Sequence, residues 1–202
     1  MTRSFEKNSE VKQDVRQFII DNAPDNPELI LTLPGPKKLD AILFHKKFPK
    51  TPIIGLENDK NSFKKLLKNP YPVTPYLMSI SQYALSLHPT LHHSMIFLDY
   101  LGWFDEEKLN DITRLAFNQN LVHDKPTVLG LTFMKANRKG SEGAIESVKG
   151  VWKDKETEYS LDCIEAKLST ELSSVKRSLE LIECREYTNP GGVGMYFILY
   201  RM

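Results

Sequence analysis

Residues 28–59 read ELILTLPGPKKLDAILFHKKFPKTPIIGLEND, and the architecture of the whole chain can be worked out from this stretch. Residues 29–33 form an apolar run that predicts a short strand, closed by a turn at Gly35. Residues 37–48 carry apolar side chains on one face and lysines elsewhere, which predicts a helix that covers a sheet. Residues 52–56 are almost entirely apolar, as in a parallel strand buried on both faces. The order strand, turn, helix, strand indicates a right-handed crossover between two parallel strands.

The segments on either side continue this alternation of helices and strands. Apolar spacing predicts further helices at residues 8–22, around 63–67, and at 81–88, 105–120 and 161–179, and further strands at 73–80, 95–98, 127–134, 182–187 and 195–200. The glycine-rich connection at residues 189–192 is so short that it can join only antiparallel neighbours. The sequence therefore predicts an α/β fold: a doubly wound, mostly parallel seven-stranded sheet with helices on both faces and a C-terminal antiparallel β-hairpin.

The chain shows no internal repeat and no linker, so we expect residues 1–202 to form a single Rossmann-like domain. Within it, residues 1–27 supply an N-terminal helix and lead-in. Residues 135–158 lack periodicity and are rich in Lys, Glu, Gly and Ser, so they are expected to form a long mobile loop. Long loops in compact domains are usually functional or disordered.

Composition and charge narrow the class of protein. Apolar residues make up 41% of the chain and charged residues 26%, which is ordinary for a soluble globular protein. Lys and Arg number 27 against 26 Asp and Glu, so the net charge gives no reason to expect a nucleic-acid or membrane partner. There is no signal-peptide pattern, no run near the roughly 18 apolar residues of a membrane span, and no metal-binding cysteine spacing. We therefore expect a cytoplasmic protein; the sequence does not specify its oligomeric state.

Two carboxylates follow predicted strands: Glu57 after the second strand and Asp99 after the fourth. The carboxyl ends of parallel strands share one edge of the sheet, where nucleoside ligands commonly bind. A ribose diol offers two hydroxyl donors, and one carboxylate such as Glu57 can accept both. Gly35 at the same edge permits positive φ and close approach of a ligand to the backbone. The alternatives are that Glu57 stabilises the N-terminus of the next helix and that Gly35 only forms a tight turn.

The arrangement over residues 28–202 resembles the class I S-adenosylmethionine-dependent methyltransferase fold. In that family a glycine-rich turn after the first strand packs against the methionine part of the cofactor, and Leu33-Pro34-Gly35 match it with a single glycine. The family's ribose-binding acid after the second strand matches Glu57, and its substrate-facing acid or amide after the fourth strand matches Asp99. The resemblance implies S-adenosylmethionine as cofactor, with Asp99 orienting the methyl acceptor and able to take a proton from it. The implied cofactor-binding residues are Leu33, Pro34, Gly35, Glu57, Asn58 and Asp99.

The residues after Asp99 include two candidates for substrate binding, Tyr100 and Trp103. Exposed aromatic rings beside an acid would orient a planar substrate by stacking. The alternative is that Trp103 and Phe104 pack against the next helix, with Asp99 as a local cap. Enzymes of this fold that methylate amino groups of nucleic acids typically have Asn or Asp, then two prolines and an aromatic residue, whereas this chain has Asp99-Tyr100-Leu101-Gly102.

His92 and His93 stand next to each other, just before the fourth strand. Adjacent histidines without a Cys or an acid at ligand spacing are more often surface turn residues than metal ligands. We therefore expect them at the surface and predict no metal site.

Nine lysines make residues 37–68 locally basic: Lys37, Lys38, Lys46, Lys47, Lys50, Lys60, Lys64, Lys65 and Lys68. They are either solvated helix faces or, with Phe48, Phe63 and Tyr71, a surface that follows phosphates. Two hypotheses therefore remain. The first is a divergent S-adenosylmethionine-dependent methyltransferase with an unidentified acceptor. The alternative is a non-catalytic Rossmann-like module that binds nucleic acid or a protein partner through the lysine-rich helix faces. The absence of G-x-G-x-x-G argues against a nicotinamide dehydrogenase.

Overall fold

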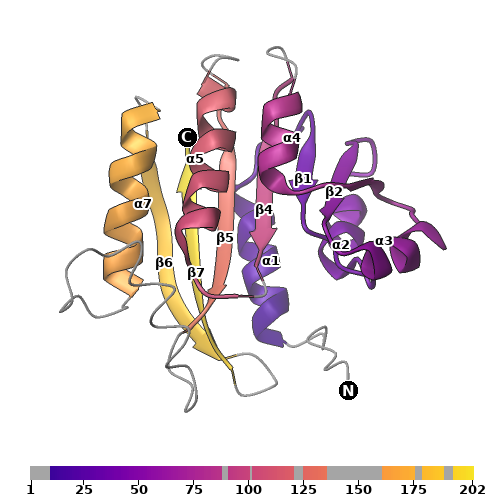
Figure 1. The fold of residues 1–202 in the computed structure, drawn as a ribbon, viewed down its shortest axis with the longest axis horizontal. Coiled ribbons are helices and arrows are strands. Elements are labelled where there is room, and N and C mark those ends of the chain that lie inside the picture. Colours follow the sequence, from indigo (N-terminus) through magenta and orange to yellow (C-terminus); the bar gives the residue numbers. More distant parts are fainter. Residues whose placement is uncertain are drawn as a thin grey trace.

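The computed structural model describes residues 10–87, 91–100, 102–120, 125–135, 161–175, 179–188 and 193–202. Their strands form one seven-stranded sheet in the order β3-β2-β1-β4-β5-β7-β6 (Figure 1). The strands are β1 (Ile30–Thr32), β2 (Ile53–Glu57), β3 (Thr74–Leu77), β4 (Met95–Asp99), β5 (Val128–Met134), β6 (Glu180–Thr188) and β7 (Gly194–Arg201). Strands β1 to β5 are parallel, and β7 runs antiparallel to both β5 and β6. The predicted mostly parallel sheet with a C-terminal antiparallel pair is confirmed.

Helices cover both faces of this sheet. They are α1 (Glu10–Asn22), α2 (Leu39–Lys47), α3 (Lys60–Leu67), α4 (Ile80–Ser86), α5 (Glu106–Asn120) and α7 (Leu161–Val175). In Figure 1, α4, α5 and α7 lie in front of the sheet and α1 lies behind it. None of the helices in the described residues is long and apolar enough to cross a membrane.

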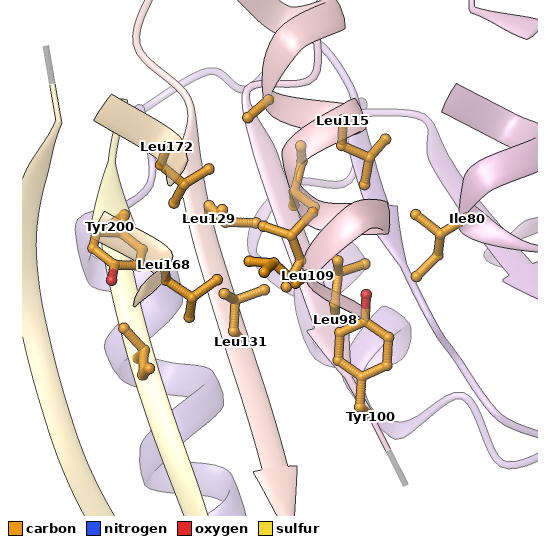
Figure 2. Close-up of a cluster of buried hydrophobic side chains, with 14 of the residues drawn as sticks. Ile80, Leu98, Tyr100, Leu109, Leu115, Leu129, Leu131, Leu168, Leu172 and Tyr200 are labelled. Carbon is orange, nitrogen blue, oxygen red and sulfur yellow. The ribbon is translucent and has the colours of Figure 1, made fainter. Parts of the chain in front are cut away.

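Strand β4 shows how the sheet builds two cores. Ile96 and Leu98 belong to a core formed with α4, α5 and α7, whereas Met95 and Phe97 belong to a second core formed with α1 and α2. Figure 2 shows the first core, in which leucines of β4 and β5 meet leucines of α5 and α7. Successive side chains of a strand point to opposite faces, so an all-apolar strand is what a sheet between two helix layers requires.

Local capping fixes where the chain leaves β2 and β3. Asp59 begins α3 by accepting a hydrogen bond from the Ser62 amide, 2.7 Å away. Ser79 begins α4 in a reciprocal capping box with Gln82. Both caps lie at the carboxyl edge of the sheet, so they also fix the backbone that leads away from this edge.

Lys38 is not part of the predicted lysine surface. Residues 34–38 form a tight turn, in which Lys38 has a left-handed φ of 54° and its amide donates to the Pro34 carbonyl at 3.1 Å. The Lys38 side chain is buried, and its ammonium donates to the backbone carbonyls of Asn69 and, at 2.8 Å, of Tyr71. The sequence interpretation of Lys38 was therefore wrong, because these carbonyls satisfy the ammonium group inside the protein.

The expectation that His92 and His93 lie at the surface is also wrong. His93 is fully buried and its Nε2 lies 2.7 Å from the Tyr83 hydroxyl, while Nε2 of the buried His92 lies 3.2 Å from Oγ1 of Thr127. Burial lowers the pKa of His93 to about 4, and the neighbouring His92 makes a smaller contribution in the same direction. A neutral imidazole with a hydrogen-bonding partner can be buried without an unpaired charge, which accounts for the buried position of His93.

Three predicted segments lie largely outside the described residues. They are the predicted loop at residues 135–158 apart from Lys135, the hairpin connection at 189–192, and the first residues of the N-terminal lead-in.

Candidate functional site

A cavity of about 820 Å³ opens at the carboxyl edge of the sheet. It lies around the ends of β1 and β4, where the strand order turns back on itself, which is the usual position of ligand sites in open α/β sheets. The volume is within the usual range for small-molecule and cofactor sites. Its walls come from the turn after β1, the ends of β2 and β4, the start of α4, and residues of α1 and α5.

The cavity brings together most of the predicted site. The residues that line it include the predicted set Leu33, Pro34, Gly35, Glu57, Asn58, Asp99 and Tyr100. Trp103 is half-buried and does not line the cavity, so the structure does not bring it to the other candidates. Residues from three separate segments of the sequence thus share one edge, as the strand order predicted.

The turn after β1 is held in one shape by its own hydrogen bonds and by packing. Gly35 has a positive φ of 54°, a conformation that favours glycine. A Cβ atom on Gly55 of β2 would lie only 2.8 Å from Cγ of Pro34, so the turn packs directly on the neighbouring strand. Pro34 and Pro36 have no N–H, so this turn shapes the cavity wall and offers few amide donors.

Glu57 ends β2 and borders the cavity. Its Oε1 accepts a hydrogen bond from the Asp59 amide at 2.9 Å, which orients the carboxylate. Asp59 caps the N-terminus of α3, and Glu57 accepts the amide of that same residue, so this contact is compatible with both roles considered for Glu57.

Asp99 ends β4 and is held by two donors. Lys12 Nζ of α1 lies 2.8 Å from its Oδ2, and Thr132 of β5 donates its hydroxyl to the other oxygen. The side chains of Lys12 and Asp99 are 10% and 13% exposed, so this is a largely buried ion pair. Asp99 is therefore positioned as a fixed, charged hydrogen-bond acceptor. At the start of α5 it is Asp105, not Asp99, that accepts the Lys108 amide, at 2.9 Å.

A second buried ion pair lies beside the first. Arg16 of α1 donates to Asp40 of α2, and both side chains are 6% exposed. Burial raises the pKa of Asp40 to about 6, with the positive charge of Arg16 opposing the shift and the negative charge of Asp99 adding to it. Lys12, Arg16 and Asp40 all line the cavity, and the sequence analysis missed them. The available signal was weak: Lys12 and Arg16 lie one turn apart, beside the apolar stripe of α1.

Tyr100 also lines the cavity, and its environment differs from the exposed ring that was expected. Its ring stacks on Phe133 with centroids 5.4 Å apart and an interplanar angle of 10°, and it is only 7% exposed. Its hydroxyl is buried without a hydrogen-bond partner among the described residues. Burial raises the pKa of Tyr100 well above its ordinary value. Phe104 packs edge-on against the same Phe133, which belongs to β5.

Further lining residues come from the start of α4 and from α5, and the sequence analysis missed these as well. Met78, Ser79 and Ile80 follow β3, while Asp111 belongs to α5. Asp111 accepts a hydrogen bond from Ser81, and burial raises the pKa of Asp111. The predicted strand at 73–80 extended through these positions, which hid the helix start at Ser79. No group of three or more His, Cys, Asp or Glu in the described ranges is arranged to hold a metal ion.

Comparisons with known proteins agree with this geometry at the level of the fold. No protein-family model matches the chain, and no curated protein matches it. Among solved structures, an S-adenosylmethionine-dependent methyltransferase from Methanosarcina mazei is similar, with a TM-score of 0.59 and 14% identity over 91% of this chain and 96% of that one. The plantazolicin methyltransferase BpumL, solved with S-adenosylhomocysteine, has a TM-score of 0.59 and 11% identity over 98% of this chain and 92% of its own.

These likenesses define the class of fold. The chain has the seven-stranded α/β fold of class I S-adenosylmethionine-dependent methyltransferases, including the antiparallel β7 between β5 and β6. At 14% identity or less, the likeness establishes the fold, and the reaction must be argued from the cavity.

Proposed function

We propose that this protein is a divergent S-adenosylmethionine-dependent methyltransferase. The observation that carries the proposal is the meeting of the Gly35 turn, Glu57 and Asp99 at one cavity, located where the strand order turns back. Each group comes from the end of a different strand, and each has chemistry suited to binding this cofactor. A non-catalytic module would need none of the three to face the same cavity.

The residues present fit the cofactor in three respects. Glu57 is an oriented carboxylate that would accept hydrogen bonds from the ribose hydroxyls. The turn of Leu33, Pro34 and Gly35 would pack against the methionine part, with positive φ at Gly35 allowing close approach. The charged Asp99 would lie near the positively charged groups of the cofactor. Asn58 borders the cavity beside Glu57 and would contribute to the same end of the site.

The bound cofactor would supply a methyl group on a positively charged sulfur, open to in-line displacement by an acceptor atom. The contribution of the protein is then mainly to position the acceptor. Asp99, fixed by Lys12 and Thr132, would orient the acceptor by hydrogen bonding. Both oxygens of Asp99 are already held by a donor, which favours a role in orienting the acceptor.

Thermal denaturation with added ligands tests the proposal without knowledge of the acceptor. S-adenosylhomocysteine at about 100 times its dissociation constant should stabilise the folded protein by about 2.7 kcal/mol and raise its Tm. ATP and NAD contain the same adenosine group but no methionine, and should give little or no shift. A protein that unfolds cooperatively with no shift from S-adenosylhomocysteine, or with an equal shift from ATP, would contradict the proposal.

A further inference from the structure

One side of the molecule carries an unbalanced positive charge. Nine lysines and three acids lie within residues 37–68, a net charge of +6 in a chain whose total is +1. Eight of the nine lysines are exposed, and we call them the lysine face: Lys37, Lys46, Lys47, Lys50, Lys60, Lys64, Lys65 and Lys68. Of the three acids, Asp40 is buried against Arg16, and only Asp59 is exposed. The charge of these lysines therefore faces solvent almost uncompensated.

The lysine face differs from the other basic residues in its lack of ion pairs. Apart from Lys37, its lysines make no ion pair within the described part of the chain. Elsewhere, most described lysines and arginines bind a carboxylate: Lys12, Arg16, Lys108, Lys125, Lys135, Lys167 and Arg201. These seven ammonium groups, which make no ion pair with any described residue, repel one another, so an anionic partner would lower their free energy.

The lysine face begins at the mouth of the cavity. Lys37 and Lys65 both line the cavity, and α2 and α3 lie together at one end of the sheet in Figure 1. The segment after α3 joins the two helices, since the Tyr71 carbonyl accepts from Lys38 and the Tyr71 ring contacts His45 of α2. A nine-residue helix such as α2 is about 13 Å long, so the lysines can follow several phosphates away from the cavity.

An exposed aromatic ring lies within this basic region. The Tyr71 side chain is 68% exposed, and its ring is held edge-on against His45 with centroids 5.0 Å apart. His45 precedes Lys46 and Lys47 in the sequence, and Lys68 lies three residues before Tyr71. Lysines around a fixed, exposed ring are the combination by which proteins bind single-stranded nucleic acids, through phosphates and base stacking.

The same residues are less suited to a membrane surface. A helix that lies in a membrane interface buries a broad apolar face. The large apolar side chains exposed on the two helices are Ile42 on α2 and Leu67 on α3. One such residue per helix does not form an apolar face, so the observations favour nucleic acid over lipid.

We propose that the lysine face binds single-stranded nucleic acid, with phosphates along α2 and α3 and a base stacked on Tyr71. Because the face begins at the cavity, the bound strand would reach Asp99 and serve as the methyl acceptor. This second part of the proposal rests on the proposed function. The binding surface itself does not depend on methyl transfer.

Fluorescence anisotropy with a labelled oligonucleotide of about 20 nucleotides tests this surface, since such a strand is longer than typical binding sites. The test variant is Lys47→Gln/Lys64→Gln/Lys68→Gln, which leaves the cavity-lining Lys37 and Lys65 in place. The matched control is Lys125→Gln/Lys167→Gln/Arg201→Gln, which removes three charges from surface ion pairs elsewhere. Both variants have the same net charge.

The test variant should bind at least about tenfold more weakly near 100 mM salt, and its log–log salt slope should fall by about 2, because about 0.7 is lost per phosphate contact. The control should bind within about twofold of the unmodified protein, because ion-paired charges far from the strand add little. Tyr71→Leu should weaken binding by about tenfold while leaving the salt slope unchanged, because it removes stacking and no phosphate contact.

Four results would overturn the proposal. They are no binding by the unmodified protein at low salt, equal losses in the two triple variants, equal affinity for heparin, and binding only to phosphatidylserine vesicles. Thermal shifts with S-adenosylhomocysteine separate this proposal from the proposed function. A rise in Tm with S-adenosylhomocysteine but no oligonucleotide binding would contradict only the proposal for the lysine face. Oligonucleotide binding without a rise in Tm would contradict only the proposed methyltransferase function.

Discussion

The ammonium group of Lys12 lies 2.8 Å from Oδ2 of Asp99, so the first helix of the chain is ion-paired to the end of the fourth strand inside the candidate cavity. The two residues are 87 positions apart. With Arg16 and Asp40, they form two adjacent buried ion pairs along α1. Helix α1 is therefore a wall of the cavity, and its position depends on charges as well as on its apolar stripe.

Replacing Lys12 should be costly because it leaves the Asp99 charge buried without its cation. Lys12→Met is expected to lower the free energy of unfolding by about 3 kcal/mol, as for other broken buried pairs. The double variant Lys12→Met/Asp99→Asn should recover part of this loss. Urea denaturation of both single variants and the double variant gives the coupling energy. Additive single effects would show that the pair contributes nothing beyond its separate members.

Removing the hydroxyl of Tyr100 is expected to stabilise the folded protein. The hydroxyl is buried without a partner among the described residues, and an unsatisfied buried polar group costs about 1–3 kcal/mol. Tyr100→Phe keeps the stacking on Phe133 and should raise the free energy of unfolding by about 1 kcal/mol. Thermal and urea denaturation measure the change. A clear loss of stability would mean that the hydroxyl has a partner in the folded protein.

Gly55 is expected to tolerate no side chain, since the turn after β1 packs on it. A Cβ atom would overlap Cγ1 of Val73 and lie 2.8 Å from Cγ of Pro34, so Gly55→Ala should destabilise the protein by about 1–3 kcal/mol. It should also weaken binding of S-adenosylhomocysteine by shifting the turn. Gly102→Ala is the matched control, because its nearest contact would be an ordinary 3.6 Å from Lys108. Equal stability of the two variants would refute the close packing of the turn.

Asp40 should make stability fall as the pH rises from about 4 to about 6. Burial raises the pKa of Asp40 from 3.8 to about 6 in the folded protein, so the folded state keeps a proton that the unfolded state has lost in this window. Ionisation above pH 6 then opposes folding by up to about 3 kcal/mol. Asp40→Asn removes this contribution. The stability of Asp40→Asn relative to the unmodified protein should therefore rise across the window, as measured by urea denaturation at each pH; parallel curves would contradict the assignment.

The strand ends of the site could be predicted because they follow from local patterns. Apolar runs located β2 and β4, and the rule that parallel strands share a carboxyl edge brought Glu57 and Asp99 together. The antiparallel pair at the C-terminus followed from the short connection between two apolar runs. These inferences need only periodicity and chain direction.

The remaining site residues depend on contacts between distant segments, which no local pattern encodes. Lys12 on α1 looks like a surface lysine until the fold places Asp99 beside it. Lys38 was interpreted as solvated because its carbonyl partners, Asn69 and Tyr71, lie more than thirty residues further along the chain. His93 was interpreted as exposed because its partner, Tyr83, lies on α4, in a separate element of the fold. In each case a polar side chain is buried because a distant group satisfies it.

The central claim is that the cavity holds S-adenosylmethionine with its ribose on Glu57, and calorimetric titration tests it most directly. S-adenosylhomocysteine should bind the unmodified protein. It should bind Glu57→Ala at least about tenfold more weakly, because charge-assisted hydrogen bonds are lost. Asp25→Ala, which removes an exposed carboxylate of the segment before β1, should bind as the unmodified protein does. The absence of heat with a folded unmodified protein, or equal affinity in Glu57→Ala, would contradict the claim.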